Sequence, residues 1–369
     1  MGVKWFALFL VCAGTSGIRA QSSSSLRVIL LGGQSNADGL APDSGLPLSP
    51  VDLQAPQTNV PYYFYVAGAA ANPDRTLGQL TTLRPGGSAT LNCFGPEVSL
   101  GFNLASYIQQ QPGATLAIIK FAWGGTTLYT DWKAGGDATT KGDGDAYYVF
   151  QKVVSAGLAD LRSAFPGATV QIDGMVWVQG ESDIGLGSVA VNAYGTNLSN
   201  FIADLRVTFS PTLPFFFSRI SDQQTYYSSP TNPYYQNYLT LRDQQELAAG
   251  TVSNVFMIDA DGPNYGVNSD NIHFNADGQL DLGAAFATSI TNALSQAPVA
   301  PSLCAYWLTN SISLTWALQP QTFILTSATN LAGPFAPEYP VSSTNFALQT
   351  ITATLPISGP QKFFRLQAQ

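Results

Sequence analysis

Residues Leu26 to Asn36 read LRVILLGGQSN, and this stretch decides the fold. Its first six residues form a mostly apolar run of strand length, which Gly32 and Gly33 end with a tight turn. A continuous apolar run is typical of a strand buried on both faces, as in a parallel sheet. We therefore predict a buried parallel sheet, with Ser35 just beyond the end of its first strand.

Similar runs recur along the chain, at residues 114–122, 170–178, 213–220 and 254–260. Between them, apolar residues recur at helical spacing over residues 98–108, 150–165, 191–205, 235–247 and 276–294. Strands that alternate with helices indicate βαβ units. The pattern predicts a three-layer α/β/α sandwich around a five-stranded parallel sheet, of the flavodoxin-like type.

The composition suits a folded, acidic protein. Hydrophobic residues make up 45% of the 369 residues, charged residues only 10%, and the net charge is −8. Nucleic acids and anionic membranes both require a basic patch, so neither is an expected partner.

The N-terminus has the pattern of an export signal. Lys4 precedes a short apolar run, residues 5–13, and small residues follow as far as Ala20. The run is too short to span a bilayer, and no later run is long enough. We expect a secreted protein, extracellular or periplasmic, from which the signal peptide of residues 1–20 is removed.

Export leaves two cysteines, Cys93 and Cys304. An oxidising compartment permits a disulfide between them, and two separate thiols are the alternative. Two isolated cysteines and a single histidine do not form a zinc-cluster pattern, so no metal site is expected.

A second domain is predicted after the charge-free, proline-containing linker of residues 296–302. Short strand patterns follow at residues 311–316, 322–326, 346–355 and 362–366. The α/β domain then spans residues 21–297, and a small all-β sandwich spans residues 298–369. The second domain resembles the immunoglobulin-like modules at the ends of secreted bacterial proteins, notably in residues 323–331 and 363–366. It is a candidate for polysaccharide or surface contact, or it is a spacer.

Polar residues and glycines that could serve in catalysis follow the predicted strands, at the edge where open parallel sheets bind their ligands. The four segments are Gly33–Asn36, Gly124–Thr126, Gln179–Asp183 and Asp270–His273. Each alone has an ordinary explanation as a turn or a cap. Together they supply a nucleophile, a base, an orienting acid and oxyanion donors, which is the full requirement for acyl transfer.

The spacing of Asp270 and His273 favours a catalytic pair. A carboxylate three residues before an imidazole can fold back and accept its Nδ1–H, leaving Nε2 to face Ser35.

These segments resemble the SGNH hydrolase superfamily, and within it the carbohydrate-esterase branch of sialate O-acetylesterases and family 6 acetylxylan esterases. The resemblance runs in order from residue 26 to residue 295. Its motifs are Gly33–Asn36, Gly95–Glu97, Ala122–Thr126 with Trp132, Trp177–Asp183 and Asp270–Phe274.

The resemblance implies a role for each site residue. Ser35 attacks the acetyl carbonyl, His273 accepts its proton and Asp270 orients His273, with Glu181 as the competing acid. The oxyanion donors are the backbone N–H groups of Ser35 and Gly125, or Gly124 in its place, with the Gln179 side chain. Substrate contacts are expected from four residues of the motifs: Gln34, Asn36, Trp123 and Trp132. No metal or organic cofactor is needed.

The implied function is a secreted serine esterase that removes acetyl groups from carbohydrates, either acetylated xylan-like polysaccharide or O-acetylated sialic acid. Sialic acid requires a cationic partner, for which Arg75, Arg84, Arg219 and Arg242 are available. The charge-poor, aromatic-rich composition favours the neutral polysaccharide. Two alternatives stay open: a non-catalytic carbohydrate-binding protein on an esterase scaffold, and an esterase for other short-chain acyl or aryl esters.

Three aromatic segments also have two interpretations, as sugar-stacking surfaces or as local packing. They are residues 61–65, 226–227 and 234–235.

Overall fold

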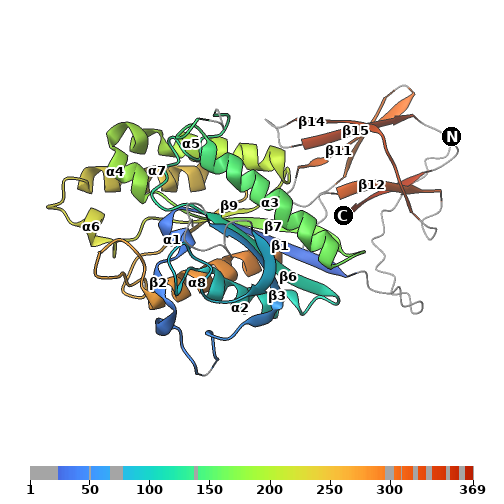
Figure 1. Ribbon diagram of the computed structural model, residues 1–369. Helices are drawn as coiled ribbons and strands as arrows, with labels where there is room; N and C mark the ends of the chain where they lie inside the picture. Colours follow the sequence, from blue (N-terminus) through green and yellow to red (C-terminus); the bar gives the residue numbers. More distant parts are fainter. Residues whose placement is uncertain are drawn as a thin grey trace.

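The computed structural model describes ten segments: residues 24–49, 51–66, 78–136, 140–295, 303–308, 310–318, 323–329, 335–345, 350–356 and 362–368 (Figure 1). The predicted export signal, residues 1–20, and the predicted linker, residues 296–302, lie outside them. In the described part of the chain, no helix is both long and apolar enough to cross a membrane.

The centre of the molecule is a sheet with the strand order β4-β3-β6-β1-β7-β8-β9. β1 (Ser25–Gly33) lies between β6 (Ala114–Ala122) and β7 (Thr169–Val178), parallel to both. β8 (Phe215–Ser218) and β9 (Val255–Ile258) extend the sheet beyond β7, again in parallel. The five predicted strands and their parallel arrangement are therefore confirmed.

The sheet has two strands more than predicted. β3 (Gln57–Val66) pairs in parallel with β6, and β4 (Gln79–Leu83) pairs antiparallel with β3 at the edge of the sheet. The first half of β3 is polar and contains Pro61, features that argue against a strand inside a sheet. Tyr62 and Tyr63 of β3 are buried, so packing is their role.

Helices cover both faces of this sheet (Figure 1). α3 (Asp145–Ala164), α5 (Ser188–Thr208) and α7 (Tyr235–Thr251) pack on one face, and α2 (Glu97–Ile108) and α8 (Ala276–Ser295) pack on the other. Because side chains alternate along a strand, β1 contributes to the apolar cores on both faces. The predicted three-layer α/β/α sandwich is confirmed.

Short elements follow the strands at their carboxyl ends. α1 (Ser35–Asp38) follows β1, α4 (Glu181–Leu186) follows β7, and α6 (Thr225–Ser228) follows β8. The turn into α1 requires glycine, because a Cβ on Gly33 would lie 2.1 Å from the Val178 carbonyl oxygen. Two small elements, β2 (Ala41–Pro42) and η1 (Asp43–Gly45), come next, and β2 pairs with β5 (Cys93–Phe94).

The described C-terminal residues form two antiparallel sheets, as expected of an all-β domain. The first has the order β10-β11-β15-β14 and the second β13-β12-β16. The strands are β10 (Cys304–Trp307), β11 (Ser311–Ala317), β12 (Phe323–Ala328), β13 (Ala336–Pro337), β14 (Val341–Asn345), β15 (Thr350–Pro356) and β16 (Phe363–Ala368). Trp316 is buried in the small core of this domain, so it is a packing residue.

The two cysteines lie in different environments. Cys93 is buried in β5 and Cys304 is exposed in β10, and no disulfide joins them in the described structure. The permitted disulfide is therefore not formed.

Candidate active site

The structure brings Ser35, His273 and Asp270 together at the carboxyl edge of the sheet. Ser35 is the first residue of α1, and the loop before α8 carries His273 to it. Ser35 Oγ lies 2.9 Å from His273 Nε2, and His273 Nδ1 lies 2.8 Å from Asp270 Oδ2. This linear arrangement is that of a nucleophile, a base and an orienting acid.

Asp270 is held in place by its own loop. Its Oδ1 accepts hydrogen bonds from the backbone N–H groups of Ile272 and His273, each at 2.9 Å. Asn271 adopts a positive φ of 61°, which closes the turn between the acid and the base. Burial acts to raise the pKa of Asp270, but these hydrogen bonds and that of the His273 ring outweigh it and lower the pKa below its ordinary value. Asp270 therefore stays ionised beside the imidazole.

Glu181, the competing acid, lies elsewhere. Its carboxylate is buried, and its Oε1 accepts hydrogen bonds from Asn36 Nδ2 and Gln224 Nε2. Both amides also donate to the Ile272 carbonyl oxygen, at 3.3 and 2.8 Å. Glu181 thus holds the two amides that reach the histidine loop, whereas Asp270 contacts the histidine itself.

Two amides complete this connection. Asn36 Oδ1 accepts the backbone N–H of Phe274 at 3.0 Å, so Asn36 contacts residues on both sides of His273. Gln224 was not predicted from the sequence. The only signal was its place after β8, at the same edge of the sheet as the other polar segments.

The glycine segment, residues Gly124–Thr126 after β6, lies beside Ser35. Gly124 packs against Ser35, since a Cβ on Gly124 would lie 3.6 Å from Ser35 Cβ. Gly125 has a φ of 78°, in the left-handed region that favours glycine. Within the described residues, the backbone N–H groups of Ser35, Gly124 and Gly125 have no hydrogen-bond acceptor. They are available to a developing oxyanion.

Gln179 differs from the expectation that its side chain completes the oxyanion hole. The residue is 1% exposed, and its Nε2 faces three protein oxygens: Thr126 O, Asp183 Oδ2 and Gln34 Oε1. Its Oε1 accepts the Tyr194 hydroxyl at 3.0 Å. The Gln179 amide therefore holds the glycine segment in place through the Thr126 carbonyl oxygen. Because both of its N–H groups face protein oxygens, neither is left for the substrate.

Burial also corrects three of the four expected substrate contacts. Gln34, Asn36 and Trp132 are buried, and Gln34 Oε1, both side-chain polar atoms of Asn36 and Trp132 Nε1 bond within the protein. Trp132 donates Nε1–H to Thr126 Oγ1 at 2.8 Å and packs edge-on against Trp177. Trp123 is the half-buried member of the set.

A buried ion pair supports α1, the helix that begins with Ser35. Lys120 Nζ lies 2.8 Å from Glu97 Oε2, and both side chains are buried. The same ammonium donates to the carbonyl oxygen of Asp38, the last residue of α1, at 2.7 Å. Glu97 also accepts the backbone N–H of Gly95. The Gly95–Glu97 motif therefore acts on Ser35 through Lys120 and α1.

Two carboxyl groups near the site should make stability depend on pH. Burial raises the pKa of Asp38 and of Asp183 to about 6, from an ordinary value of 3.8. Between pH 4 and 6 the folded protein therefore binds protons that the unfolded chain has released. Below that range both states are protonated, and above it the buried charges destabilise the fold, by on the order of 3 kcal/mol each.

We therefore expect the free energy of unfolding, measured by urea titration, to rise as the pH falls from 7 to 5. Asp183→Asn removes one of the two titrations, so it should reduce the difference between the two pH values. A protein that is equally stable at both, or more stable at pH 7, would contradict this expectation.

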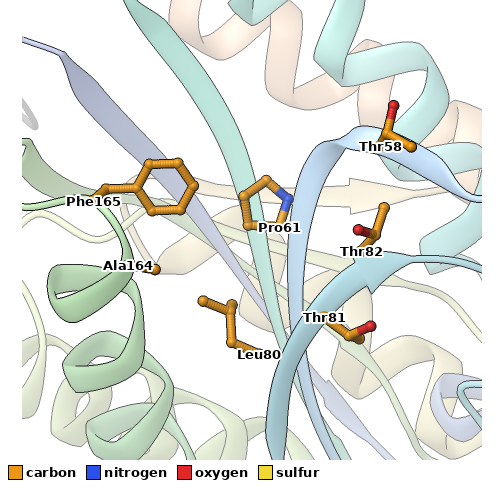
Figure 2. A pocket seen from close by; sticks show the side chains of 7 residues that line it. All are labelled: Thr58, Pro61, Leu80, Thr81, Thr82, Ala164 and Phe165. Carbon is orange, nitrogen blue, oxygen red and sulfur yellow. The ribbon is translucent and has the colours of Figure 1, made fainter.

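Figure 2 shows a surface pocket of about 360 Å³ that includes none of these residues in its lining. It is lined by Thr58, Pro61, Leu80, Thr81, Thr82, Ala164 and Phe165. Thr58 is close to the start of β3, which runs parallel to β6. The pocket is therefore at the amino edge of the sheet, opposite Ser35, and is separate from the site.

Comparisons with known proteins agree with this geometry. Residues 25–292 match the family described as carbohydrate esterase, sialic acid-specific acetylesterase. No curated protein sequence matches the chain. A solved structure of a protein from Arabidopsis thaliana is 20% identical, covers 72% of this chain and 98% of its own, and has a TM-score of 0.51.

Two carbohydrate esterases of known structure are also similar. A carbohydrate acetylesterase from Xanthomonas citri is 16% identical, with 89% of this chain and 74% of its own covered and a TM-score of 0.46. A family 2 carbohydrate esterase with a carbohydrate-binding domain, from Corynascus thermopiles (Myceliophthora fergusii), is 17% identical, with 76% and 69% covered and a TM-score of 0.39.

The family match spans the α/β domain and includes every residue of the site. This chain belongs to the sialic acid-specific acetylesterase family of carbohydrate esterases and is a carboxylic ester hydrolase that acts on acetylated carbohydrates.

Proposed function

We propose that this enzyme removes O-acetyl groups from neutral polysaccharides of the acetylated xylan type, through an acetyl-enzyme intermediate on Ser35. The observation that carries the proposal is the chain of short contacts from Ser35 Oγ through the His273 ring to Asp270, at 2.9 and 2.8 Å.

The first half-reaction transfers the acetyl group to the enzyme. Ser35 Oγ bonds to the acetyl carbonyl carbon while His273 Nε2 takes the hydroxyl proton, and Asp270 stabilises the resulting imidazolium. Backbone N–H groups of Ser35 and the Gly124–Gly125 turn stabilise the tetrahedral oxyanion. The ester C–O bond then breaks, and His273 returns the proton to the departing sugar oxygen.

The second half-reaction restores the serine. Water gives a proton to His273 Nε2 and attacks the acetyl carbon, and the bond to Ser35 Oγ breaks. His273 protonates the serine oxygen, and acetate leaves.

Charge near the site supports a neutral sugar. Arg219 contacts three carboxylates, those of Glu246, Asp259 and Asp261. Arg242 forms two hydrogen bonds to Asp261, at 2.7 and 2.8 Å. Both guanidinium groups are thus neutralised within the protein and poorly suited to bind the carboxylate of a sialic acid.

The other two arginines offered by the sequence do not alter this argument. Arg84 follows Leu83, which pairs with the first residue of β3 at the amino edge of the sheet, opposite Ser35. Arg75 lies outside the described residues.

Export and the C-terminal module belong to the same proposal on sequence grounds. The signal pattern of residues 1–20 supports secretion, where polysaccharide substrates occur. The module of residues 298–369 is proposed to contact polysaccharide or a surface.

The test is acetate release from acetylated xylan and from 9-O-acetylated sialic acid, measured in parallel with equal concentrations of ester. We expect faster release from xylan. Faster release from sialic acid would contradict the neutral substrate. If only 4-nitrophenyl acetate is hydrolysed, neither carbohydrate is the substrate.

A further inference from the structure

The segment after β8 lies beside the catalytic loop. Gln224 Nε2 donates to the Ile272 carbonyl oxygen at 2.8 Å, and the backbone N–H of Tyr226 donates to the Asn271 carbonyl oxygen at 3.2 Å. These bonds attach α6 to the two residues that precede His273. Figure 1 shows α6 next to the chain that leads into α8.

Three tyrosines cluster at this position. The rings of Tyr226 and Tyr234 are stacked, with centroids 6.2 Å apart and planes inclined by 26°. Tyr227 meets the Tyr226 ring edge-on at 4.9 Å and is itself buried. Tyr226 is 42% exposed, which is a large fraction for an aromatic ring already packed against two others. The buried ring therefore supports an aromatic surface that is open to solvent.

Two exposed acids belong to the segments that carry or adjoin this aromatic surface. Asp222 precedes α6 and Asp270 lies in the catalytic loop, and both residues are exposed. Arg219 and Arg242, the cations closest in sequence, are bound to carboxylates. An anionic ligand is therefore disfavoured here, whereas a neutral ligand with apolar C–H faces can pack on the rings.

We propose that Tyr226 and Tyr234 form a stacking subsite for a sugar unit adjacent to the acetylated one. The subsite binds the neutral polysaccharide chain beyond the reacting ester and so determines the preference for polymer over small esters. The inference rests on the proposed function, and it deepens that function by assigning part of the specificity to two residues outside the family's motifs.

The kinetic test compares the native enzyme with Tyr226→Ala and Tyr226→Phe on acetylated xylo-oligosaccharides. We expect Tyr226→Ala to raise KM about five- to tenfold, the effect of one lost aromatic contact, with little change in kcat. Tyr226→Phe keeps the ring and should restore KM. The backbone bond to Asn271 is present in all three proteins, so the catalytic loop keeps its support.

Tyr148→Ala on α3 is a matched control, because Tyr148 is 40% exposed and lies outside the site. It should leave KM for the oligosaccharides unaltered. Hydrolysis of 4-nitrophenyl acetate separates binding from chemistry. If Tyr226→Ala lowers kcat/KM for this small ester as much as for the oligosaccharides, Tyr226 acts by packing and the subsite proposal is wrong. It is also wrong if KM stays at the native value.

A binding measurement distinguishes this proposal from the proposed function. The Ser35→Ala protein is titrated calorimetrically with xylohexaose, with and without Tyr226→Ala. Weaker binding by the double variant supports the subsite, even if the native enzyme releases no acetate from xylan, in which case only the proposed function fails. Equal affinity of the two proteins, or no binding by either, overturns the subsite.

Discussion

Replacing Ser35 by alanine is expected to lower kcat for acetate release by about 10⁴- to 10⁶-fold, the range for removal of a serine nucleophile. The reason is geometric, because Ser35 Oγ is the hydroxyl that His273 Nε2 contacts, at 2.9 Å. His273→Ala should cause a loss of similar size, since the serine then has no base. The measurement is the rate of acetate release at saturating ester.

The double variant gives the sharper test. If Ser35 and His273 act in one proton transfer, removal of both should cost little more than removal of either. Ser106→Ala, at an exposed serine on α2, is the control and should retain native activity. An active Ser35→Ala enzyme would show that another group is the nucleophile, and losses that multiply would show that the two residues act separately.

The predictability of the fold from sequence depended on the burial of each strand. The five strands β1, β6, β7, β8 and β9 are mostly apolar, because helices cover both faces of the sheet. β3 and β4 were missed because they lie towards the edge of the sheet, where polar residues and Pro61 are tolerated. A sequence pattern reports burial directly and pairing only indirectly.

The site was predictable in position but less so in the role of each residue. Parallel strands share one carboxyl edge, so the loops carrying Ser35 and His273 both leave the sheet at that edge. The sequence could not show which polar side chains of these loops face outwards. Gln34 and Asn36 flank Ser35, and Gln179 belongs to a separate motif at the same edge of the sheet, yet all three are buried and hold the loops together. Gln224 serves the same purpose from a segment without a motif.

Asp270→Asn is expected to lower kcat by about 10³- to 10⁴-fold while the protein keeps its structure. An asparagine Oδ1 can still accept the backbone N–H groups of Ile272 and His273, so the turn is retained. Its amide nitrogen, however, takes the place of the oxygen that lies 2.8 Å from His273 Nδ1. The amide then donates to Nδ1, which moves the ring proton to Nε2, where it faces Ser35. A base that already carries its proton cannot accept another from the serine.

Glu181→Gln makes the same change, from carboxylate to amide, in the competing acid. Its kcat is to be compared with that of Asp270→Asn. The Glu181 oxygen that accepts Asn36 and Gln224 has a counterpart in glutamine, and within the described residues the other oxygen has no hydrogen-bond partner. We therefore expect kcat to fall by less than about tenfold. This is the effect expected of a residue that positions the loops through its hydrogen bonds and whose negative charge the reaction does not need. If Glu181→Gln reduces kcat as much as Asp270→Asn, the negative charge of Glu181 is needed as well. If only Glu181→Gln is inactive, Glu181 is the acid that stabilises the imidazolium, and the contact between Asp270 and His273 only shapes the turn.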